Sequence, residues 1–398
     1  MNYVSLADVA EINPRIDRKS IANQSEIVSF VSMADVSEDT GRIVHQTDRL
    51  IRDVMKGFTP FKDRDILIAK ITPCFENGKI IHAHIRNFMG FGSTEFHVLR
   101  ANKRTLNDRY LFHFLRQKRI RVEGERRMTG SAGQRRVPKK FFEELKLHLP
   151  PLSEQKRIAA ILDKTDALRE KRRQAIAKLD ELLQSVFLDM FGDPVTNPKR
   201  WKDETSLGEV AEIVSGITVG RKLNGKATRE IPYMAVVNVQ DRRLNLQTIK
   251  TIQATEEEID KYRLLENDLL LTEGGDPDKL GRGTLWKNEL PESIHQNHIF
   301  RVRLMVEDLN PCFLNWLIGS RRGKQYFLRS AKQTTGIASI NMTQLRNFPL
   351  LIPPVEIQNA FADKIDHIGL QQQQFLAHQN RLDSLFVSLQ QRAFKGEL

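Results

Sequence analysis

The apolar residues between positions 153 and 191 recur at alternating spacings of three and four. No proline or glycine interrupts this segment, and Gly192 and Pro194 stand just beyond its end. The pattern, sustained for about four heptads, predicts one long helix of about 55–60 Å with a single apolar stripe. The stripe comprises Ile158, Ile161, Leu168, Ala175, Leu179, Leu182 and Val186, with Thr165 and Arg172 in its two gaps.

A second helix with a stripe of the same kind is predicted for residues 355–394. A lone helix of this length cannot bury its stripe, whereas two helices can bury each other's. A globular segment precedes each helix, so we expect antiparallel pairing with pseudo-two-fold symmetry and one globular domain at each end. The alternative is that each helix packs back on its own domain. The second stripe comprises Phe361, Ile365, Ile368, Gln372, Phe375, Gln379, Leu382, Phe386 and Leu389.

The chain is an internal duplication. Five segments recur in the same order at an offset of 201 residues at the start and 203 at the end. A period this long excludes a solenoid and indicates two copies of one unit. The pairs are SLADVAEI at 5–12 with SLGEVAEI at 206–213, DILI at 65–68 with DLLL at 268–271, TGS at 129–131 with TGI at 335–337, LPPL at 149–152 with IPPV at 352–355, and LD at 179–180 with LD at 382–383.

Each copy begins with a mixed region of helices and strands. Ser5 with Asp8, and Ser206 with Glu209, have the spacing of capping boxes and predict short helices. Asn-Gly at 77–78 is a strong signal for a β-hairpin. We predict strands at 65–71, 80–85 and 95–99, and helices at 108–122 and 311–328.

The fold class is therefore α+β, with two duplicated globular domains separated by two long antiparallel helices that form a coiled-coil spacer. The predicted division is 1–151 for the first domain, 152–193 for the central long helix, 194–353 for the second domain and 354–398 for the C-terminal long helix.

The charge of the chain points to a polyanionic partner. Lysine and arginine total 62 against 50 acidic residues, which gives a net charge of +12. Two distant cysteines, Cys74 and Cys312, exclude a disulfide scaffold and a cysteine-rich zinc site. The N-terminus lacks the pattern of a signal peptide, and no apolar run reaches the ~18 residues of a membrane span. We therefore expect a cytoplasmic protein with no membrane partner.

The positive charge gathers at the same place in both copies. Residues 115–140 contain ten basic side chains and only two acidic ones, around the loop TGSAGQ at 129–134. Residues 318–346 contain six basic side chains and no acidic one, around QTTGIASIN at 333–341. Arginine, lysine and small polar or amide side chains are the types that bind phosphates and base edges. The alternative for either segment is a solvated helix face.

A second pair of loops, 70–79 and 272–279, shares its position in the two copies but not its residues. Divergent loops on a duplicated frame are expected of two domains that read different targets, although surface loops also drift freely. The predicted DNA-binding residues are Lys70, Thr72, Asn77, Lys79, Arg126, Arg127, Thr129, Ser131, Gln134, Arg135, Arg136, Arg221, Thr272, Lys279, Arg329, Lys332, Gln333, Thr335, Ser339 and Asn341.

Enzymatic motifs are absent from the sequence. It has no phosphate-binding loop, no Gly-x-Gly-x-x-Gly and no His-Glu-x-x-His. His82 and His84 share one side of a predicted strand, and Glu273 lies near Asp276 and Asp278, but ordinary polar roles suit both groups better than metal binding. We predict no catalytic residue and no metal ligand.

The chain resembles the specificity subunit of type I restriction–modification systems over essentially its whole length. The resemblance is carried by LPPLSEQKRI at 149–158 and its weaker echo IPPVEIQ at 352–358, by the SLxxVAEI openings, and by the Thr-Gly loops ahead of each double proline. The second copy departs from the motif at Val355 and Ile357, which makes the start of its helix less certain.

This resemblance implies two target-recognition domains, each of which reads one half of a split double-stranded DNA site. The helical spacer would set the separation of the half-sites and hold two methyltransferase subunits, and two translocase–nuclease subunits would add cleavage. The chain itself would be non-catalytic and would work in the cytoplasm of a prokaryote. S-adenosylmethionine, ATP and magnesium would be used by the other subunits.

Three other classes of protein are alternatives. A free-standing adenine methyltransferase would need an Asn/Asp-Pro-Pro-aromatic motif, and the only Pro-Pro pairs follow Leu149 and Ile352. A bifunctional restriction enzyme would carry catalytic domains on the same chain. A coiled-coil adaptor would bind DNA without sequence preference.

Overall fold

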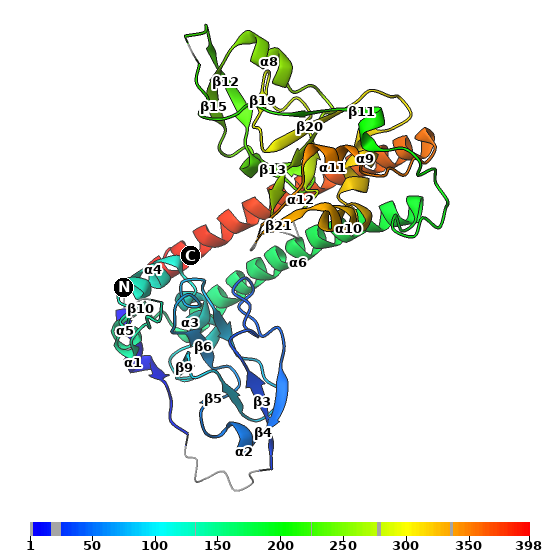
Figure 1. The fold of residues 1–398 in the computed structure, drawn as a ribbon. Coiled ribbons are helices and arrows are strands. Elements are labelled where there is room, and N and C mark those ends of the chain that lie inside the picture. Colours follow the sequence, from blue (N-terminus) through cyan, green and yellow to red (C-terminus); the bar gives the residue numbers. More distant parts are fainter. Residues whose placement is uncertain (1–2, 17–24, 132, 224, 277–279, 335–336) are drawn as a thin grey trace. The chain divides into compact units, whose positions relative to one another are not determined.

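The structure is a computed structural model (Figure 1). It describes residues 3–16, 25–131, 133–223, 225–276, 280–334 and 337–398. Its contacts group the chain into two units. Unit 1 comprises Met1–Ile176 and Gln374–Leu398, and unit 2 comprises Ala177–Gln373. This grouping follows contacts rather than domain ends, so the four-segment division above remains a prediction.

Unit 1 contains two four-stranded sheets. The first has the order β2-β9-β6-β7 and is wholly antiparallel, and the second has the order β4-β3-β8-β5 with a parallel β3–β8 pair. The strands are β2 Ala10–Ile12, β9 Phe96–Ala101, β6 Ile66–Ala69, β7 Ile80–His82, β4 Thr47–Leu50, β3 Ile27–Val31, β8 Gly90–Gly92 and β5 Thr59–Phe61, with β1 Tyr3–Ser5 and β10 Lys146–His148 as a separate pair and α2 at Ile51–Val54.

Unit 2 repeats this plan. Its four-stranded sheet has the order β11-β20-β16-β18, and its three-stranded sheet has the order β15-β12-β19 with a parallel β12–β19 pair. The elements are β11 Ala211–Ser215, β20 Ile299–Leu304, β16 Leu269–Thr272, β18 Gly283–Leu285, β15 Lys250–Ala254, β12 Arg229–Met234, β19 Ile294–His295, the pair β13 Val239–Gln240 and β14 Arg243–Leu244, the 3-10 helix η2 Val236–Asn238, and α8 Glu256–Tyr262.

Strand register confirms the duplication. Leu67 lies opposite Val98 in unit 1, and Leu270 lies opposite Arg301 in unit 2, so both partners are shifted by the same 203 residues. β6 and β16 are the central strands and are buried along their whole length. Because side chains alternate along a strand, each central strand contributes to two apolar clusters, one on each face of its sheet.

The same buried ion pair braces both sheets. Asp65 binds the Arg100 guanidinium through two hydrogen bonds of 2.8 and 2.6 Å. Asp268 binds Arg303 in the same way, with two bonds of 2.7 Å. A buried carboxylate needs a partner of this kind, because an isolated buried charge is strongly destabilising. The pair therefore belongs to the frame and not to the divergent loops.

The short helices at the start of each copy are confirmed, but the predicted helices 108–122 and 311–328 are each broken into two. Gln117 adopts an extended backbone at the break, and both its backbone N–H and its side-chain amide donate to the Phe114 carbonyl. After the break the second helix begins at Lys118 and buries Ile120. The helices are α1 Leu6–Val9 and α7 Leu207–Val210, α3 Asp108–Leu115 and α4 Lys118–Arg126, and α9 Pro311–Ile318 and α10 Arg321–Ser330.

The predicted hairpin around Asn-Gly is present in a different form. β6 and β7 do pair antiparallel, but they are joined by the ten-residue loop 70–79 rather than by a two-residue turn. A helical turn occupies this loop, with Phe75 N bonded to Ile71 O at 3.0 Å. Gly78 then reverses the chain with φ of +80°.

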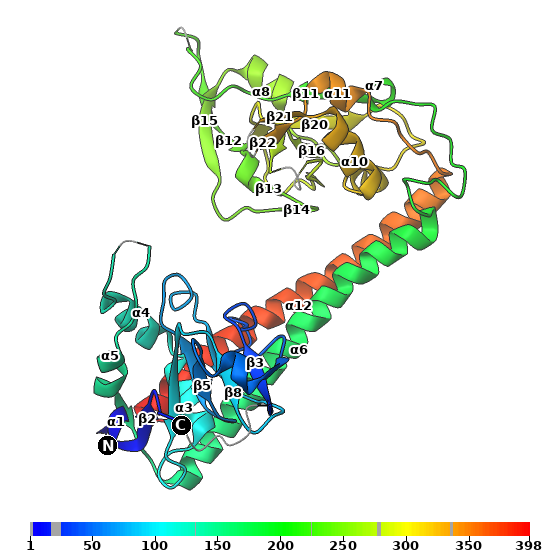
Figure 2. The same cartoon turned by 60° about the horizontal axis from the view of Figure 1, so that its bottom comes forward.

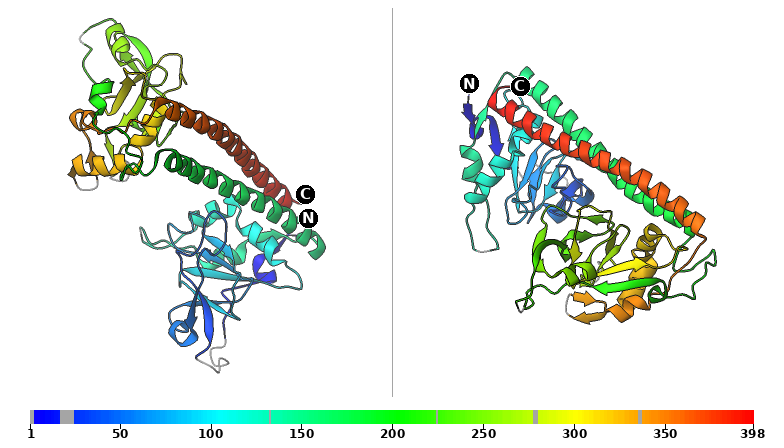
Figure 3. Two further views of the ribbon diagram at one scale, coloured as in Figure 1. Left: turned by 90° about the vertical axis from the view of Figure 1, so that its right-hand side faces the viewer. Right: turned by 90° about the horizontal axis from the view of Figure 1, so that it is seen from above.

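The two long helices pair antiparallel within each unit (Figures 2 and 3). They are α6 Leu152–Phe191 and α12 Val355–Lys395, close to the predicted bounds. In unit 1 Arg169 binds Asp383 at 2.5 Å, and in unit 2 Gln372 binds Asp180 at 2.6 Å. The alternative also holds in part, because the first half of each helix packs on the domain that precedes it.

The predicted stripe is wrong at two positions. Leu168 and Leu182 were expected in the seam, yet their exposed fractions are 47% and 45%. Polar residues occupy the seam nearby: Thr165 and Gln379 are buried, and Arg172 lies 4.2 Å from the centre of the Phe375 ring. The central seam is therefore partly polar, and some of its apolar surface remains exposed.

A buried glutamine explains the double-proline motif. Gln155 is fully buried, donates to the Thr105 and Pro150 carbonyls at 2.9 Å, and accepts from Asn107 N at 2.8 Å. Gln358 makes the equivalent three bonds at 2.7–3.0 Å. The start of the second helix is thus anchored like the first, despite the changes at neighbouring positions.

Candidate nucleic-acid interface

Two loops predicted to bind DNA lie side by side in unit 1. Thr72 N donates to Arg135 O at 3.0 Å, and Val137 N donates to Lys70 O at 2.8 Å. A β-bridge also joins Ile71 to Arg136. Loop 70–79 and residues 126–137, which we call loop site 1, therefore form one surface at the end of β6.

Close packing holds α4 against this surface. Gly124 is buried beside the Phe75 ring, and a Cβ there would come within 2.5 Å of that ring. Phe141, in α5 Lys139–Glu144, approaches the same glycine. This contact fixes the end of α4, and with it Arg126, at the edge of loop site 1.

Several predicted residues of loop site 1 face solvent. Arg126 is exposed, and among the described residues neither it nor Arg135 has an ion-pair partner. These two guanidinium groups can take up phosphate oxygens without giving up an existing partner. The other exposed members are Asn77, Thr129, Ser131 and Gln134.

Other predicted residues are already engaged within the protein. Arg127 binds Glu123 at 2.8 Å and Glu144 at 3.1 Å. Arg136 makes three hydrogen bonds of 2.9–3.2 Å to Glu95, which lies 41 residues away in sequence. Lys79 donates to the Met33 carbonyl at 2.9 Å, and the Thr72 hydroxyl donates to Glu76 at 2.8 Å. Their contribution to DNA binding remains a prediction.

Unit 2 has the same arrangement at the end of β16. There β17, Gly274–Gly275, pairs with β22, Ile337–Ser339, which pairs with β21, Lys332–Thr334. Ile340 N also donates to Glu273 O at 2.9 Å. The described residues of 272–276 and 332–341 therefore form loop site 2, the counterpart of loop site 1.

The predicted residues of loop site 2 lie along these strands. Lys332 and Gln333 are in β21, and Ser339 is the last residue of β22. Asn341 caps α11, Met342–Arg346, by accepting from Gln344 N at 2.9 Å. Lys279 and Thr335 lie outside the described residues.

Three predicted residues of unit 2 are placed apart from these strands. Arg221 binds Glu258 at 2.6 Å and the Gln253 carbonyl at 2.9 Å, beside α8 and β15. Thr272 is the last residue of β16, and its side chain is buried, which removes it from direct contact with DNA in this structure. Arg329 is exposed near the end of α10.

Sequence reasoning missed the acidic members of the two sites. Glu95 stands beside Lys70 through a backbone bond of 2.8 Å, and Glu273 stands beside His298 through one of 3.0 Å. The sequence analysis selected basic, amide and hydroxyl side chains as DNA-binding candidates, so it passed over these two glutamates. The signal that could have found them is the duplicated register, which places Lys70 and Glu95 at the positions of Glu273 and His298.

The histidine pair serves an internal network. The buried His82 binds Asp108 at 2.5 Å and His84 at 3.1 Å, and Arg64 also binds Asp108. Burial alone would raise the pKa of Asp108, but the hydrogen bonds from His82 and Arg64 hold that pKa well below its ordinary value. Within the described ranges no group of three or more His, Cys, Asp or Glu side chains could hold a metal ion.

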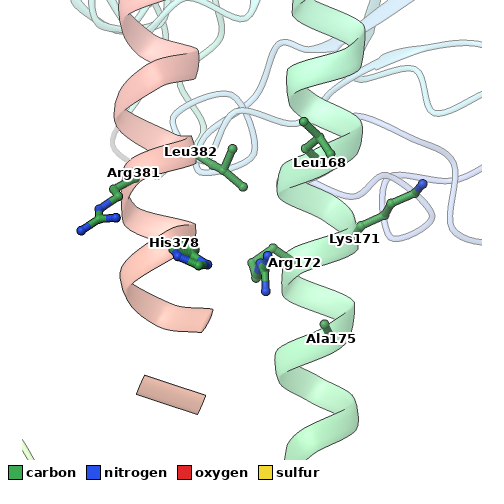
Figure 4. A pocket seen from close by; sticks show the side chains of 7 residues that line it. All are labelled: Leu168, Lys171, Arg172, Ala175, His378, Arg381 and Leu382. Atoms are coloured by element: carbon green, nitrogen blue, oxygen red, sulfur yellow. The ribbon is translucent and has the colours of Figure 1, made fainter. Parts of the chain in front are cut away.

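Unit 1 also has a groove between the facing parts of α6 and α12, with a volume of about 540 Å³ (Figure 4). Leu168, Ala175 and Leu382 give it apolar walls, and its other lining side chains are all basic or histidine. No described carboxylate forms an ion pair with them. We call it the basic groove; it is lined by Leu168, Lys171, Arg172, Ala175, His378, Arg381 and Leu382.

Comparison with known proteins identifies the family. The model of the type I restriction modification DNA specificity domain matches residues 1–179 and again 198–380, so each copy carries one match. The chain therefore belongs to this family. In the part of the chain that the structure describes, no helix is long and apolar enough to cross a membrane.

Relatives of known name agree with this assignment. The EcoAI specificity subunit of Escherichia coli is 38% identical over 186 residues, which cover 46% of this chain and 31% of that protein. The chain thus matches less than a third of that relative's length. The StySPI specificity subunit of Salmonella potsdam is 24% identical over 90% of this chain and 79% of its own.

A solved structure shares the fold. The crystal structure of the type I restriction–modification system S subunit from M. genitalium superimposes with a TM-score of 0.56, covering 99% of this chain and 96% of that one at 14% identity.

Proposed function

We propose that this chain is the DNA sequence-specificity subunit of a type I restriction–modification complex, in which each unit reads one half of a bipartite site. One observation carries the proposal: a strand register shared by both units presents two loop sites at equivalent positions with different residues. A duplicated frame keeps the geometry of recognition, while different loops allow two different half-sites.

The chemistry of loop site 1 suits DNA. Exposed Arg126 and the unpaired Arg135 supply cations for phosphates, and Asn77 and Gln134 supply amides that can pair with base edges. The equivalent segment of unit 2, residues 318–346, also contains six basic residues. The net charge of +12 adds a long-range attraction that speeds association with DNA.

Catalysis belongs, in this proposal, to other subunits. Two methyltransferase subunits would supply adenine methylation with S-adenosylmethionine, and two translocase–nuclease subunits would supply ATP- and magnesium-dependent cleavage. The absence of catalytic motifs from the sequence supports this division. The complex would act in the prokaryotic cytoplasm.

The basic groove is our candidate for part of the contact with a methyltransferase subunit. Its apolar walls can receive an apolar side chain from a partner helix, and its rim can pair with flanking carboxylates on that helix. Charge complementarity favours an acidic protein surface of this kind, because the apolar walls would gain nothing from a phosphate backbone.

The function is tested by exchanging the two domains separately. The chain is expressed with its methyltransferase subunit in cells without other adenine methylation, and methylated adenines are mapped across the genome. Replacing residues 1–150 with the same region of a related subunit should change one half-site only, and replacing 200–350 should change only the other. Methylation without a defined sequence would instead favour the non-specific adaptor.

A further inference from the structure

This inference rests on the proposed function and concerns one pair of positions in each loop site. The position after the central strand and the position before the next strand of the sheet are joined by one backbone hydrogen bond. It runs from Lys70 N to Glu95 O at 2.8 Å in unit 1, and from Glu273 N to His298 O at 3.0 Å in unit 2. Glu273 lies 203 residues after Lys70, and His298 lies 203 residues after Glu95, so the two pairs are structurally equivalent.

The side chains of this pair are reversed in polarity between the units. Unit 1 has a cation at the first position and a carboxylate at the second, Lys70 and Glu95. Unit 2 has a carboxylate at the first and a histidine at the second, Glu273 and His298. The backbone frame is thus kept, but the carboxylate stands at the second position in unit 1 and at the first position in unit 2, unlike the Asp–Arg pair that is identical in both sheets.

Each carboxylate is held in a fixed orientation and remains partly exposed. Glu95 is bound by Arg136 through three hydrogen bonds, and its side chain is 26% exposed. Glu273 is bound by His298 at 2.6 Å and is 35% exposed. A carboxylate has about four acceptor positions, so each can still accept a further hydrogen bond.

Ionisation restricts what these groups can recognise. Arg136, by its hydrogen bonds, lowers the pKa of Glu95, which is therefore ionised at neutral pH and can only accept. An ionised carboxylate repels phosphates and the acceptor atoms of guanine. Its favourable partners on base edges in the major groove are the amino groups of cytosine and adenine.

We propose that Glu95 and Glu273 are specificity-determining residues, each accepting a hydrogen bond from the exocyclic amino group of a cytosine or adenine in its own half-site. A carboxylate on a DNA-binding surface lowers the affinity for every sequence, because it repels phosphates. A hydrogen bond from a base amino group offsets this loss of affinity only in sequences that place such a group opposite the carboxylate. The pair then discriminates by repulsion as well as by attraction. Because the carboxylate is the second member of the pair in unit 1 and the first in unit 2, the amino group would be required at different positions of the two half-sites.

The test uses the Glu273→Gln variant in the complex with its methyltransferase subunit. Glutamine keeps the shape of the side chain and adds a donor, so it should also accept guanine or thymine. Methylated adenines are mapped, and rates are measured on duplexes that differ by one base pair. We expect discrimination to fall about 5- to 150-fold at one position of one half-site, with the other half-site unchanged.

Two companion variants make the result decisive. Glu95→Gln should relax one position of the opposite half-site, and it offers a second test if the first variant is unstable. Glu257→Gln removes the same charge from an exposed site on α8 and should leave every position unchanged.

The outcomes separate the two proposals. Wild-type complex that methylates no defined bipartite sequence overturns the proposed function. If wild type reads such a sequence, an identical preference in Glu273→Gln and Glu95→Gln overturns the inference and leaves the pairs with a structural role only. A uniform reduction in rate with unchanged sequence preference overturns it as well.

Discussion

At the scale of single residues, the structure separates the arginines of loop site 1 into two groups. Arg126 and Arg135 have no ion-pair partner among the described residues, whereas Arg127 and Arg136 are bound to carboxylates. A phosphate must compete with those carboxylates for the second pair. Sequence alone treats all four as equal, because Glu95 lies 41 residues from the arginine that it holds.

This difference predicts unequal salt dependence of DNA binding. Replacing Arg126 and Arg135 by glutamine should lower the slope of log K against log salt by about 0.9 for each phosphate interaction that is removed, or about 1.8 in total. The matched double variant of Arg127 and Arg136 should lower it by less, because those groups are already partly neutralised. Binding titrations at several salt concentrations measure both slopes.

Equal slopes for the two double variants would show that the ion pairs open freely when DNA binds. If both double variants kept the slope of the wild type, the DNA phosphates would bind outside loop site 1. Thermal unfolding of each variant checks that the fold is retained, since the exposed Arg126 contributes little to packing.

At the scale of elements, the sequence predicted the helices and strands whose formation depends on a local pattern of residues. The heptad spacing predicted both long helices, the capping boxes predicted the short ones, and the β-branched residues at 65–71 predicted the central strand of the first copy. The double-proline motif marked the helix starts because Gln155 must satisfy three backbone groups there. Such features are encoded within a few residues and can be recognised without the fold.

Features that depend on tertiary contacts were missed. The break at Gln117, after which α4 buries Ile120 and Gly124, has no signal in the local sequence pattern. Leu168 stays half exposed because it lines an open groove between α6 and α12, which heptad spacing alone does not reveal. The acidic members of the loop sites are visible only once strand register aligns the two copies.

The basic groove gives a prediction for α6 and α12. Changing Lys171 and Arg381 to glutamate should abolish or strongly weaken copurification with the methyltransferase subunit, because the rim would then repel a partner's carboxylates. Isolated chain should keep its unfolding temperature, since neither side chain is buried. The charge-matched control changes the exposed Lys103 and Arg104, which lie outside the groove, and should copurify normally.

Retained copurification in the groove variant would show that the partner binds elsewhere. Failure of both variants to copurify would point to net charge rather than to this surface. Comparison of the two double variants at one salt concentration therefore decides between a local contact and a general electrostatic effect.

At the scale of the whole molecule, the proposed role of the long helices is to fix the number of base pairs between two half-sites. α6 is one uninterrupted helix of 40 residues, or about 60 Å, and contributes residues to both units. Half-sites about one turn of DNA apart are ~34–36 Å from centre to centre, which is within that length. The site should therefore be two short blocks around a spacer of fixed length.

Lengthening both helices tests this role. One heptad is inserted between Arg172 and Asp180 of α6 and another between Gln372 and Phe375 of α12, because these segments face each other in the antiparallel pairing. The pair should grow by about 10 Å, which corresponds to about three base pairs. Mapped methylated adenines should then show a spacer about three base pairs longer between unchanged half-sites.

Three base pairs also turn the duplex by about 100°, so the one-heptad variant should modify its new site slowly. Inserting three heptads in each helix adds about 32 Å, close to one full turn of DNA. The second half-site then lies on the same side of the duplex as before, so the rate of methylation should be restored. A heptad in α6 alone leaves the seam out of register and should abolish modification. Modification at the original spacing by the evenly lengthened variants would show that the helices do not set the distance, and the spacer would then have to be set by the methyltransferase subunits.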